Sequence, residues 1–342
     1  MDDIPASVKT DKEAIQYMSE IDEILKQKGF RIKKWFHNCN VPTTNEETLY
    51  SLQTVNETKM DTSAEGVLGM MWDMAHDILY FKSKDTVRRD KHCTKRNVLS
   101  VTNSIFDPLG LLTPFTTRAK MIMRHVWAYE PRIDWDGSLP PEIERDWKQM
   151  LIQLEELSNI SFSRATCPTV SLNLGSPILV IFSDASMQSY GAVAYLRWEC
   201  GGTFVSRLVM AKSRTAPLKT IDIVRLELCG AVLSSRIRLT IQREMTQKVS
   251  KVIHLTDSEI VHAMVHRQSY GFNTFVANRV GEIQQHSLSK EWVWVSGSPL
   301  ENVADIITRG REHNLSIWSL LLQKLTLLQI ESTVLVLADG IN

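Results

Sequence analysis

The stretch that decides the fold is residues 177–186, Pro-Ile-Leu-Val-Ile-Phe-Ser-Asp-Ala-Ser. Its five consecutive apolar residues, Ile178–Phe182, indicate a central strand buried on both faces, because a half-exposed strand would alternate apolar and polar side chains. The run ends abruptly in Ser183 and Asp184. We therefore expect the middle strand of a sheet to carry the Asp184 carboxylate at its end.

The segments that follow predict the rest of an α/β sheet. The Gly201-Gly202 pair favours a hairpin turn between two strands, and a long amphipathic segment predicts a crossover helix before the chain returns to the sheet. In order, the predicted elements are strands at 190–198 and 203–210, a helix at 222–244, strands at 251–256 and 291–295, and a helix from 302. This order predicts a five-stranded mixed sheet with flanking helices.

Carboxylates stand at corresponding places in this sheet. If the crossover is right-handed and the returning strand lies parallel to the first, Asp184 and Asp257 end neighbouring strands at one edge. Glu227, in the crossover helix, and Asp305, in the first turn of the last helix, can close the group. Four clustered carboxylates raise one another's pKa unless cations hold them, and Mg²⁺ prefers such oxygen ligands. The pattern therefore favours phosphodiester hydrolysis with two Mg²⁺ (or Mn²⁺) ions.

Each of these carboxylates also has a purely structural explanation. Asp184 could start a turn, Asp257 could cap the next helix, and Glu227 could be a surface residue of its helix. Asn302 followed by Asp305 resembles a capping pair. Taken singly, the structural explanations are favoured; the ordered placement of all four is harder to explain without a metal.

The N-terminal half predicts mixed α+β structure. A helix is expected at 10–29, and a small sheet within 30–81 that includes strands at 31–35 and 67–72. A run of basic residues from Lys84 to Arg96 is either a solvated face or a surface that tracks phosphates. After a turn at 107–110, two helices are expected near 114–128 and 141–157.

Composition limits the classes of protein that remain. Lys+Arg and Asp+Glu both number 39, so a nucleic-acid partner has to be held by local basic patches. The five cysteines are odd in number and form no Cys-x-x-Cys pair, which argues against a disulfide framework and a zinc knuckle. Neither a signal peptide nor a long apolar run is evident. We expect an intracellular protein, cytoplasmic or nuclear and not secreted, without a membrane partner.

Four ordered motifs resemble the polyprotein of BEL/Pao-type LTR retroelements. They are Phe182-Ser183-Asp184-Ala185-Ser186, Arg225-Leu226-Glu227-Leu228, Thr256-Asp257-Ser258 and Ala304-Asp305-Ile306-Ile307-Thr308-Arg309-Gly310. The resemblance implies an RNase H-like domain in which Asp184, Glu227, Asp257 and Asp305 are both the catalytic residues and the metal ligands. It implies an RNA/DNA hybrid as substrate, other retroelement polyprotein parts as partners, and no small-molecule cofactor. The chain departs from the family at Val224 and Val303, where proline is usual.

The resemblance also divides the chain into segments. Residues 1–82 would be a truncated reverse transcriptase palm end and residues 83–167 a thumb- or connection-like helical segment. Residues 168–312 would be the RNase H-like domain and residues 313–342 a divergent tail. Met1-Asp2-Asp3 resembles the end of a Tyr-x-Asp-Asp polymerase motif that lacks its tyrosine, so we expect no polymerase activity.

Three other functions compete with the nuclease. The serious alternative is a catalytically inactive remnant that binds nucleic acid through Lys212, Arg214 and Arg225; the four retained acidic residues favour the enzyme by a modest margin. An aspartic peptidase needs an Asp-Thr-Gly or Asp-Ser-Gly turn, and the chain has neither. His262 and His266 have zinc-ligand spacing but no third ligand is evident, so exposed histidines are the better explanation.

Overall fold

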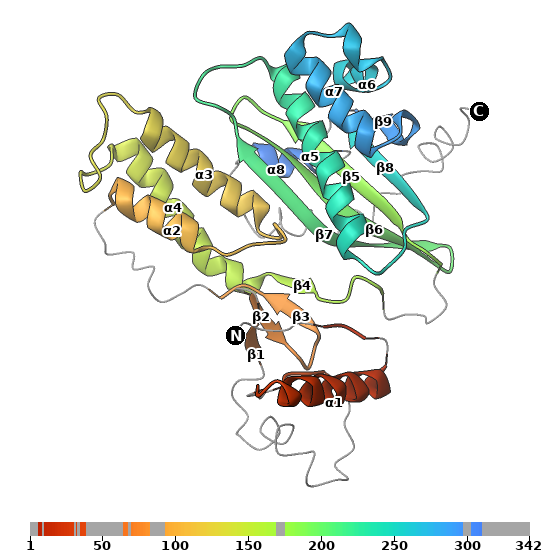
Figure 1. Cartoon of the computed structure of the whole chain (residues 1–342). Coiled ribbons are helices and arrows are strands. Elements are labelled where there is room, and N and C mark those ends of the chain that lie inside the picture. The colour runs from red at the N-terminus through yellow and green to blue at the C-terminus, as the bar shows by residue number, and fades with distance from the viewer. Residues whose placement is uncertain are drawn as a thin grey trace. The chain divides into compact units, whose positions relative to one another are not determined.

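The computed structural model describes residues 6–8, 10–30, 32, 35–38, 64–67, 70–82, 93–168, 175–296 and 302–309. Two compact units make up the chain, and each is considered by itself (Figure 1). Unit 1 comprises Met1–Lys82 and Ser161–Arg164, and unit 2 comprises Ser83–Ile160 and Ala165–Asn342. The predictions for residues 1–3, 84–92 and 313–342 concern residues outside the described ones.

Unit 1 combines one helix with a small antiparallel sheet. Helix α1 begins after Thr10, whose hydroxyl accepts the Glu13 backbone N–H at 3.2 Å, and Gly29 follows it with a positive φ. The expected strand over 67–72 is wrong as a single element, because the chain turns back between Val67 and Met70. The elements are α1 (Asp11–Gln27), β1 (Ala64–Val67), β2 (Met70–Asp73), β3 (Ile78–Tyr80) and β4 (Ser161–Ser163), with sheet order β1-β2-β3-β4.

Unit 2 contains the predicted five-stranded mixed sheet, in the order β7-β6-β5-β8-β9. β5, β6 and β7 form an antiparallel meander, whereas β8 runs parallel to β5 and β9 runs parallel to β8. The strands are β5 (Ile178–Ala185), β6 (Ser189–Cys200), β7 (Thr203–Thr215), β8 (Lys251–Thr256) and β9 (Trp292–Trp294). The α/β fold class is therefore confirmed, with the buried strand 178–185 at the centre of the sheet.

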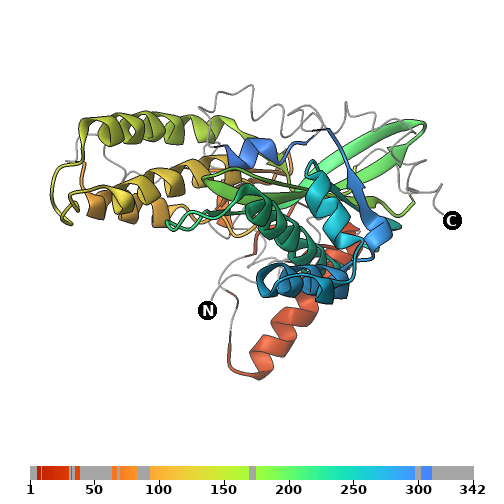
Figure 2. The same cartoon turned by 90° about the horizontal axis from the view of Figure 1, so that it is seen from above.

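Helices cover both faces of this sheet (Figure 2). The crossover helix α5 (Ile223–Glu244) packs Leu233 and Ile237 against Leu179 and Ile181 of β5. On the same side, α5 also packs against α7 (Thr274–His286), while α6 (Glu259–Val265) follows β8. The short helix α8 (Asp305–Thr308) lies on the opposite face.

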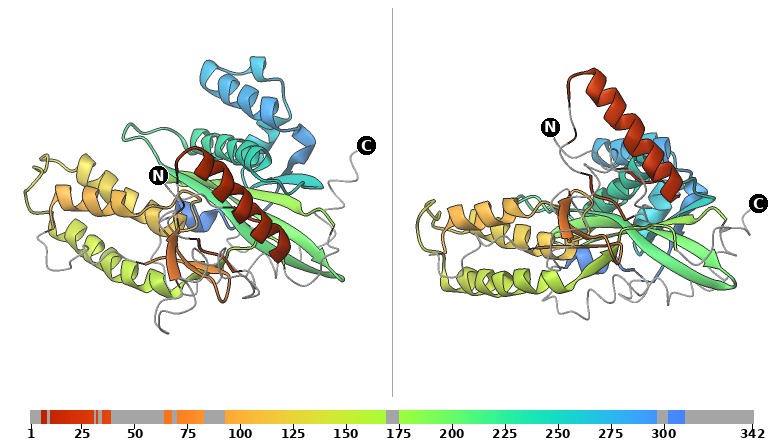
Figure 3. Two further views of the ribbon diagram at one scale, coloured as in Figure 1. Left: turned by 60° about the horizontal axis from the view of Figure 1, so that its bottom comes forward. Right: turned by 90° about the horizontal axis from the view of Figure 1, so that it is seen from below.

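Three helices of unit 2 pack together, α2 (Lys95–Ser104), α3 (Thr113–Ala128) and α4 (Pro141–Glu156) (Figure 3), and α3 packs against β7. The expectations for α3 and α4 are confirmed, whereas α2, which begins with the last two residues of the basic run and continues beyond it, was not predicted. The expected turn at 107–110 lies along β7, where Leu109 O accepts the Ala211 N–H at 2.9 Å. Gly110 has a φ of +73°, and a Cβ there would lie 1.8 Å from Ala211 O, so only glycine fits.

Within the described residues, no helix has both the length and the apolar character that crossing a membrane requires. The division into palm-end, thumb-like and RNase H-like segments stays a prediction.

Candidate metal centre

Two carboxylates of the candidate site come from neighbouring parallel strands. Ser183 of β5 is in register with Thr256 of β8, so the next residue of each strand, Asp184 and Asp257, stands at the same edge of the sheet. The apolar run Ile178–Phe182 buries β5, and β8 is buried from Val252 to Thr256 even though it includes His254. The acidic side chains come at the ends of these buried stretches. The prediction that the crossover makes these strands parallel neighbours is confirmed.

A third carboxylate, Glu227, comes from the first turns of α5. Asp222 caps this helix by accepting the Arg225 backbone N–H at 2.9 Å, which fixes where the helix begins. One turn after Glu227, Gly230 allows the helix to approach the sheet, because a Cβ at this position would lie 2.9 Å from Asp184 O. A glycine therefore sets how close Glu227 comes to Asp184.

A second glycine, Gly191, allows a close approach to the other face of the sheet. A Cβ on Gly191, the cross-strand partner of Asp184, would lie 2.9 Å from Ile307 Cδ1 of α8. α5 and α8 thus approach Asp184 from opposite faces of the sheet, α5 through Gly230 and α8 over Gly191.

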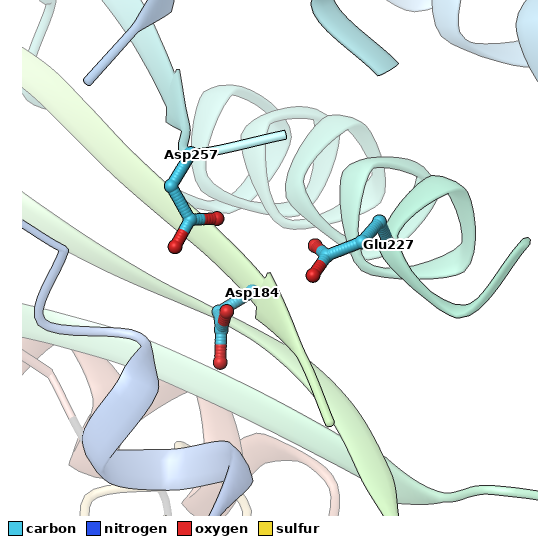
Figure 4. Close-up of side chains that lie close together, drawn as sticks. All are labelled: Asp184, Glu227 and Asp257. Carbon is cyan, nitrogen blue, oxygen red and sulfur yellow. The ribbon is translucent and has the colours of Figure 1, made fainter. Parts of the chain in front are cut away.

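The three side chains point into a shared space (Figure 4). One carboxylate oxygen from each of Asp184, Glu227 and Asp257 lies within 4.8 Å of the other two. Glu227 Oε2 and Asp257 Oδ1 are buried and have no hydrogen-bond partner in the part of the chain that the structure describes. Buried carboxylate oxygens without a donor are costly, and a hard divalent cation is the ligand that would satisfy them. The donor set fits Mg²⁺ or Mn²⁺.

Burial and mutual repulsion raise the pKa of all three carboxyl groups. Desolvation is the main cause at each, and it raises the pKa of Asp184 to about 7 and that of Glu227 to about 9. Asp257 adds repulsion at Asp184 and Glu227, while desolvation together with Asp305 raises the pKa of Asp257 itself. Nearby Arg309 opposes these shifts at all three groups without cancelling them. The cluster therefore lacks positive charge of its own.

The fourth predicted ligand, Asp305, lies close by but outside the group of three. It is buried at the start of α8 and forms an ion pair with Arg309. Its charge raises the pKa of both Asp184 and Asp257, so it acts on the same space. The structure thus brings three of the four predicted carboxylates together and pairs the fourth with an arginine.

Two buried polar residues beside Asp305 hold the carboxylates in place. Asn302 is fully buried, donates to Ser183 O at 3.0 Å and hydrogen-bonds the Asp257 side chain. The Thr308 hydroxyl donates to Asp184 Oδ2. Sequence reasoning interpreted Asn302 only as a helix cap and gave Thr308 no role, although both belong to the segment that carries Asp305.

The three predicted nucleic-acid-binding residues differ in how available they are. Lys212 and Arg214 are exposed on β7. Arg225 is half-buried, lies 3.2 Å from Asp222 Oδ2 and has its guanidinium 5.2 Å from the centre of the Phe275 ring. Its charge is therefore partly neutralised, whereas those of Lys212 and Arg214 face solvent.

The histidine pair shows no sign of a zinc site. His262 Nε2 lies 3.2 Å from Trp292 O, and His266 Nδ1 lies 2.8 Å from His262 O. Across the described ranges, the acidic group is the one cluster of three potential metal ligands.

A mixed sheet of this order, with a helical crossover between β5 and β8 and acidic residues at the ends of both strands, defines an RNase H-like domain. Residues 94–258, just under half of the chain, match the family model for the Pao retrotransposon-like RNaseH-like domain. The match supports the resemblance of this part of the chain to a Pao/BEL-type retrotransposon polyprotein region. The match includes Asp184, Glu227 and Asp257 and ends before Asp305.

Solved RNase H structures are similar to a smaller part of the chain. The N-terminal RNase H domain of a Mycobacterium tuberculosis protein, fused to maltose-binding protein, is 14% identical, with a TM-score of 0.26, over 36% of this chain and 85% of that chain. RNase H1 from Halobacterium salinarum NRC-1 is 9% identical, with a TM-score of 0.24, over 36% of this chain and 88% of that chain. No curated protein matches the chain.

Proposed function

We propose that this chain is a metal-dependent nuclease that hydrolyses the RNA strand of RNA/DNA hybrids. The observation that carries the proposal is the convergence of Asp184, Glu227 and Asp257, from three separate elements, to within 4.8 Å of one another. A purely structural role does not account for this cluster, because it buries like charges and leaves carboxylate oxygens without partners. The RNase H-like family match supports the choice of substrate.

In this proposal the three carboxylates would hold two Mg²⁺ ions, and Asp305, now paired with Arg309, would be a further ligand. Bound divalent ions supply an activated water and stabilise the charge that develops on the phosphate. The chain's own residues orient the ligands: Thr308 fixes Asp184, and Asn302 fixes Asp257 relative to Ser183. Exposed Lys212 and Arg214 are proposed to contact the backbone of the substrate, and 2′-hydroxyl contacts to select RNA.

The test is cleavage of an end-labelled RNA/DNA hybrid by the full chain with Mg²⁺. Glu227→Gln removes a ligand from the start of α5, and Glu244→Gln, an exposed position at the end of the same helix, is the matched control. We expect the wild-type chain and Glu244→Gln to cut the RNA strand, and Glu227→Gln and Asp184→Asn to leave it intact. Duplex DNA of the same sequence should not be cut by any of them.

Two results would overturn the proposal. A folded wild-type chain that binds the hybrid but does not cut it with Mg²⁺ or Mn²⁺ is not a nuclease. Cleavage that persists at an equal rate in Asp184→Asn and Glu227→Gln would come from a contaminant or from another site.

One observation favours the inactive nucleic-acid-binding remnant as a second candidate. Asp305 is ion-paired with Arg309, so the predicted quartet is incomplete in this arrangement. Arg309→Ala separates the two functions, because it frees Asp305 and should leave a competent nuclease at least as active. If the hybrid is bound with equal affinity by wild type and Asp184→Asn and is never cut, the remnant is the better account.

A further inference from the structure

Two exposed tryptophans and a half-buried lysine form a cluster far along the chain from the carboxylates. Trp127, at the end of α3, and Trp135, in the following loop, retain 37% and 47% of their surface, and their ring centroids lie 5.9 Å apart in an edge-to-face arrangement. Lys95 Nζ lies 4.5 Å from the Trp127 ring centroid and 5.3 Å from that of Trp135. We call Lys95, Trp127 and Trp135 the indole patch.

The loop that carries Trp135 is fixed by contacts other than the packing of its ring. Arg96 donates its backbone N–H to Trp135 O at 3.0 Å, and its side chain binds Asp136 through two hydrogen bonds of 2.8 and 3.0 Å. Thr94 and Ser138 form a further β-bridge at the base of the loop. Because these bonds hold the loop, the two large exposed rings are not explained by the need to close it.

The charges around the indole patch favour an anionic partner. Arg96 is neutralised by Asp136, but no carboxylate in the described part of the chain pairs with Lys95. An ammonium group over an indole face keeps N–H donors for a phosphate, while the exposed ring offers a flat surface on which a base can stack. Bases of a duplex are already stacked on one another, so the partner that fits is an unpaired strand.

The patch is linked to the candidate metal centre through one arginine. Arg124, one helical turn before Trp127, donates to Ala216 O at 3.0 Å and Pro217 O at 3.2 Å. That segment leads directly into α5, which carries Glu227.

We propose that the indole patch binds single-stranded nucleic acid, with Trp135 stacking on a base and Lys95 contacting a phosphate. In the context of the proposed nuclease, which this inference extends, the patch holds the single-stranded continuation of a hybrid whose duplex part lies at the carboxylates. The last two residues of the basic run thus have different roles in this proposal. Lys95 contacts the ligand, whereas Arg96 holds the loop through Trp135 O and Asp136.

The test measures binding and not cleavage, so it does not depend on the nuclease. The full chain in EDTA is titrated into a fluorescein-labelled DNA single strand of about 20 nucleotides, a length that exceeds one binding module. Trp135→Ala should weaken binding about five-fold or more, and Lys95→Gln should reduce the slope of log K against log salt by about 0.7. Tyr270→Ala and Lys290→Gln, exposed residues of the same types elsewhere in unit 2, are the matched controls and should bind as wild type.

A second readout separates recognition from folding. If Trp135→Ala lowers both the melting temperature and the affinity while Lys95→Gln leaves the salt slope unchanged, the rings are structural and the proposal is wrong. It is equally wrong if the wild-type chain does not bind the single strand, or if both variants bind as tightly as wild type. Asp184→Asn should retain full single-strand binding, so a failure of the nuclease proposal alone leaves this result intact.

Discussion

His254 and Asp257 lie three residues apart at the end of β8, and both are polar groups removed from water, yet they meet that cost in opposite ways. His254 is fully buried, its Nδ1 lies 2.6 Å from Ser234 Oγ, and its ring stacks on Trp292 with centroids 4.5 Å apart. Burial lowers the pKa of His254 to about 3, so the ring is neutral throughout the physiological range.

The carboxylate cluster, by contrast, contains buried acidic groups that repel one another and include oxygens without hydrogen-bond partners. Glu227 and Asp257 keep buried oxygens without partners. Burial raises the pKa of each, with added repulsion from Asp184 at Glu227 and from Asp305 at Asp257. His254 is hydrogen-bonded through Nδ1 and stacked on Trp292, and although its buried Nε2 has no partner among the described residues, the ring carries no charge. Three ionised carboxylates at this distance destabilise the fold unless a bound cation supplies positive charge. The comparison indicates that His254 stabilises the fold, whereas the carboxylates are arranged to bind a ligand.

The largest expected effect is on activity. Asp257→Asn should lower hybrid cleavage on the order of 1,000-fold, because loss of a metal ligand removes about 4 kcal/mol of transition-state stabilisation. The metal-free variant should be at least as stable to urea as wild type, since the substitution removes a buried charge. Single-turnover cleavage and urea unfolding in EDTA measure the two effects. Lower stability together with unchanged cleavage would reverse the assignment of this site.

At His254 the opposite pattern is expected. His254→Ala should lower the free energy of unfolding by about 3 kcal/mol, because it removes the stack on Trp292 and leaves a cavity. Ser234→Ala, which removes only the hydroxyl, should cost about 1 kcal/mol. Both are measured by urea unfolding. Cleavage per folded molecule should stay within about two-fold of wild type, and a larger loss would give His254 a functional role.

The stability of the metal-free chain should depend on pH with a definite sign. The folded-state pKa values of Asp184 and Glu227, about 7 and about 9, lie above the ordinary values of 3.8 and 4.5. Between about pH 4 and pH 9 the folded chain therefore holds protons that the unfolded chain has released, so stability is highest at the acid end and falls as pH rises. We expect Tm to fall by about 5 °C or more across this range.

Scanning calorimetry in EDTA and in Mg²⁺ measures this dependence. Mg²⁺ should stabilise the chain more at pH 8.5 than at pH 5.5, because protons compete for the same oxygens. The double variant Asp184→Asn, Glu227→Gln should lose most of the slope, and the raised pKa of Asp257 leaves a smaller one. A slope of undiminished size in the double variant would place its origin elsewhere.

The smallest effect is expected at Thr308, whose hydroxyl donates to Asp184 Oδ2. Thr308→Val keeps the shape but removes a bond that favours the charged form of Asp184. Mg²⁺ affinity should fall about ten-fold, as for other residues that orient a metal ligand. The acidic limb of the pH–rate profile should also move to higher pH, which a purely structural loss would not do. Titration calorimetry and the pH profile test the two claims.

The sequence predicted the sheet well because its signals are local. An unbroken apolar run such as Ile178–Phe182 indicates a central strand without any knowledge of its neighbours. The same holds for α5, whose period and cap are visible in its own residues. α2 was missed because Val98, Leu99 and Val101 are the only apolar residues among its ten, too weak a pattern to indicate a helix.

The candidate site was predicted less completely, because its geometry depends on contacts between distant segments. The parallel pairing of β5 and β8 follows from a general rule of handedness, so Asp184 and Asp257 could be placed side by side. The ion pair between Asp305 and Arg309, and the hydrogen bonds of Asn302 and Thr308, depend on how α8 docks on the sheet. No periodic pattern encodes that docking.

The turn at residues 107–110 has a practical consequence for anyone who would isolate the RNase H-like region. β7 is the outermost strand on its side of the sheet, and the Leu109 carbonyl occupies one of its backbone N–H groups. A fragment that starts at residue 168 lacks this cover and presents a bare strand of 13 residues to its neighbours. Uncovered edge strands of that length pair with other chains, so such a fragment is at risk of self-association and aggregation. A fragment that begins before α2 retains the turn at 107–110 and its hydrogen bond to β7.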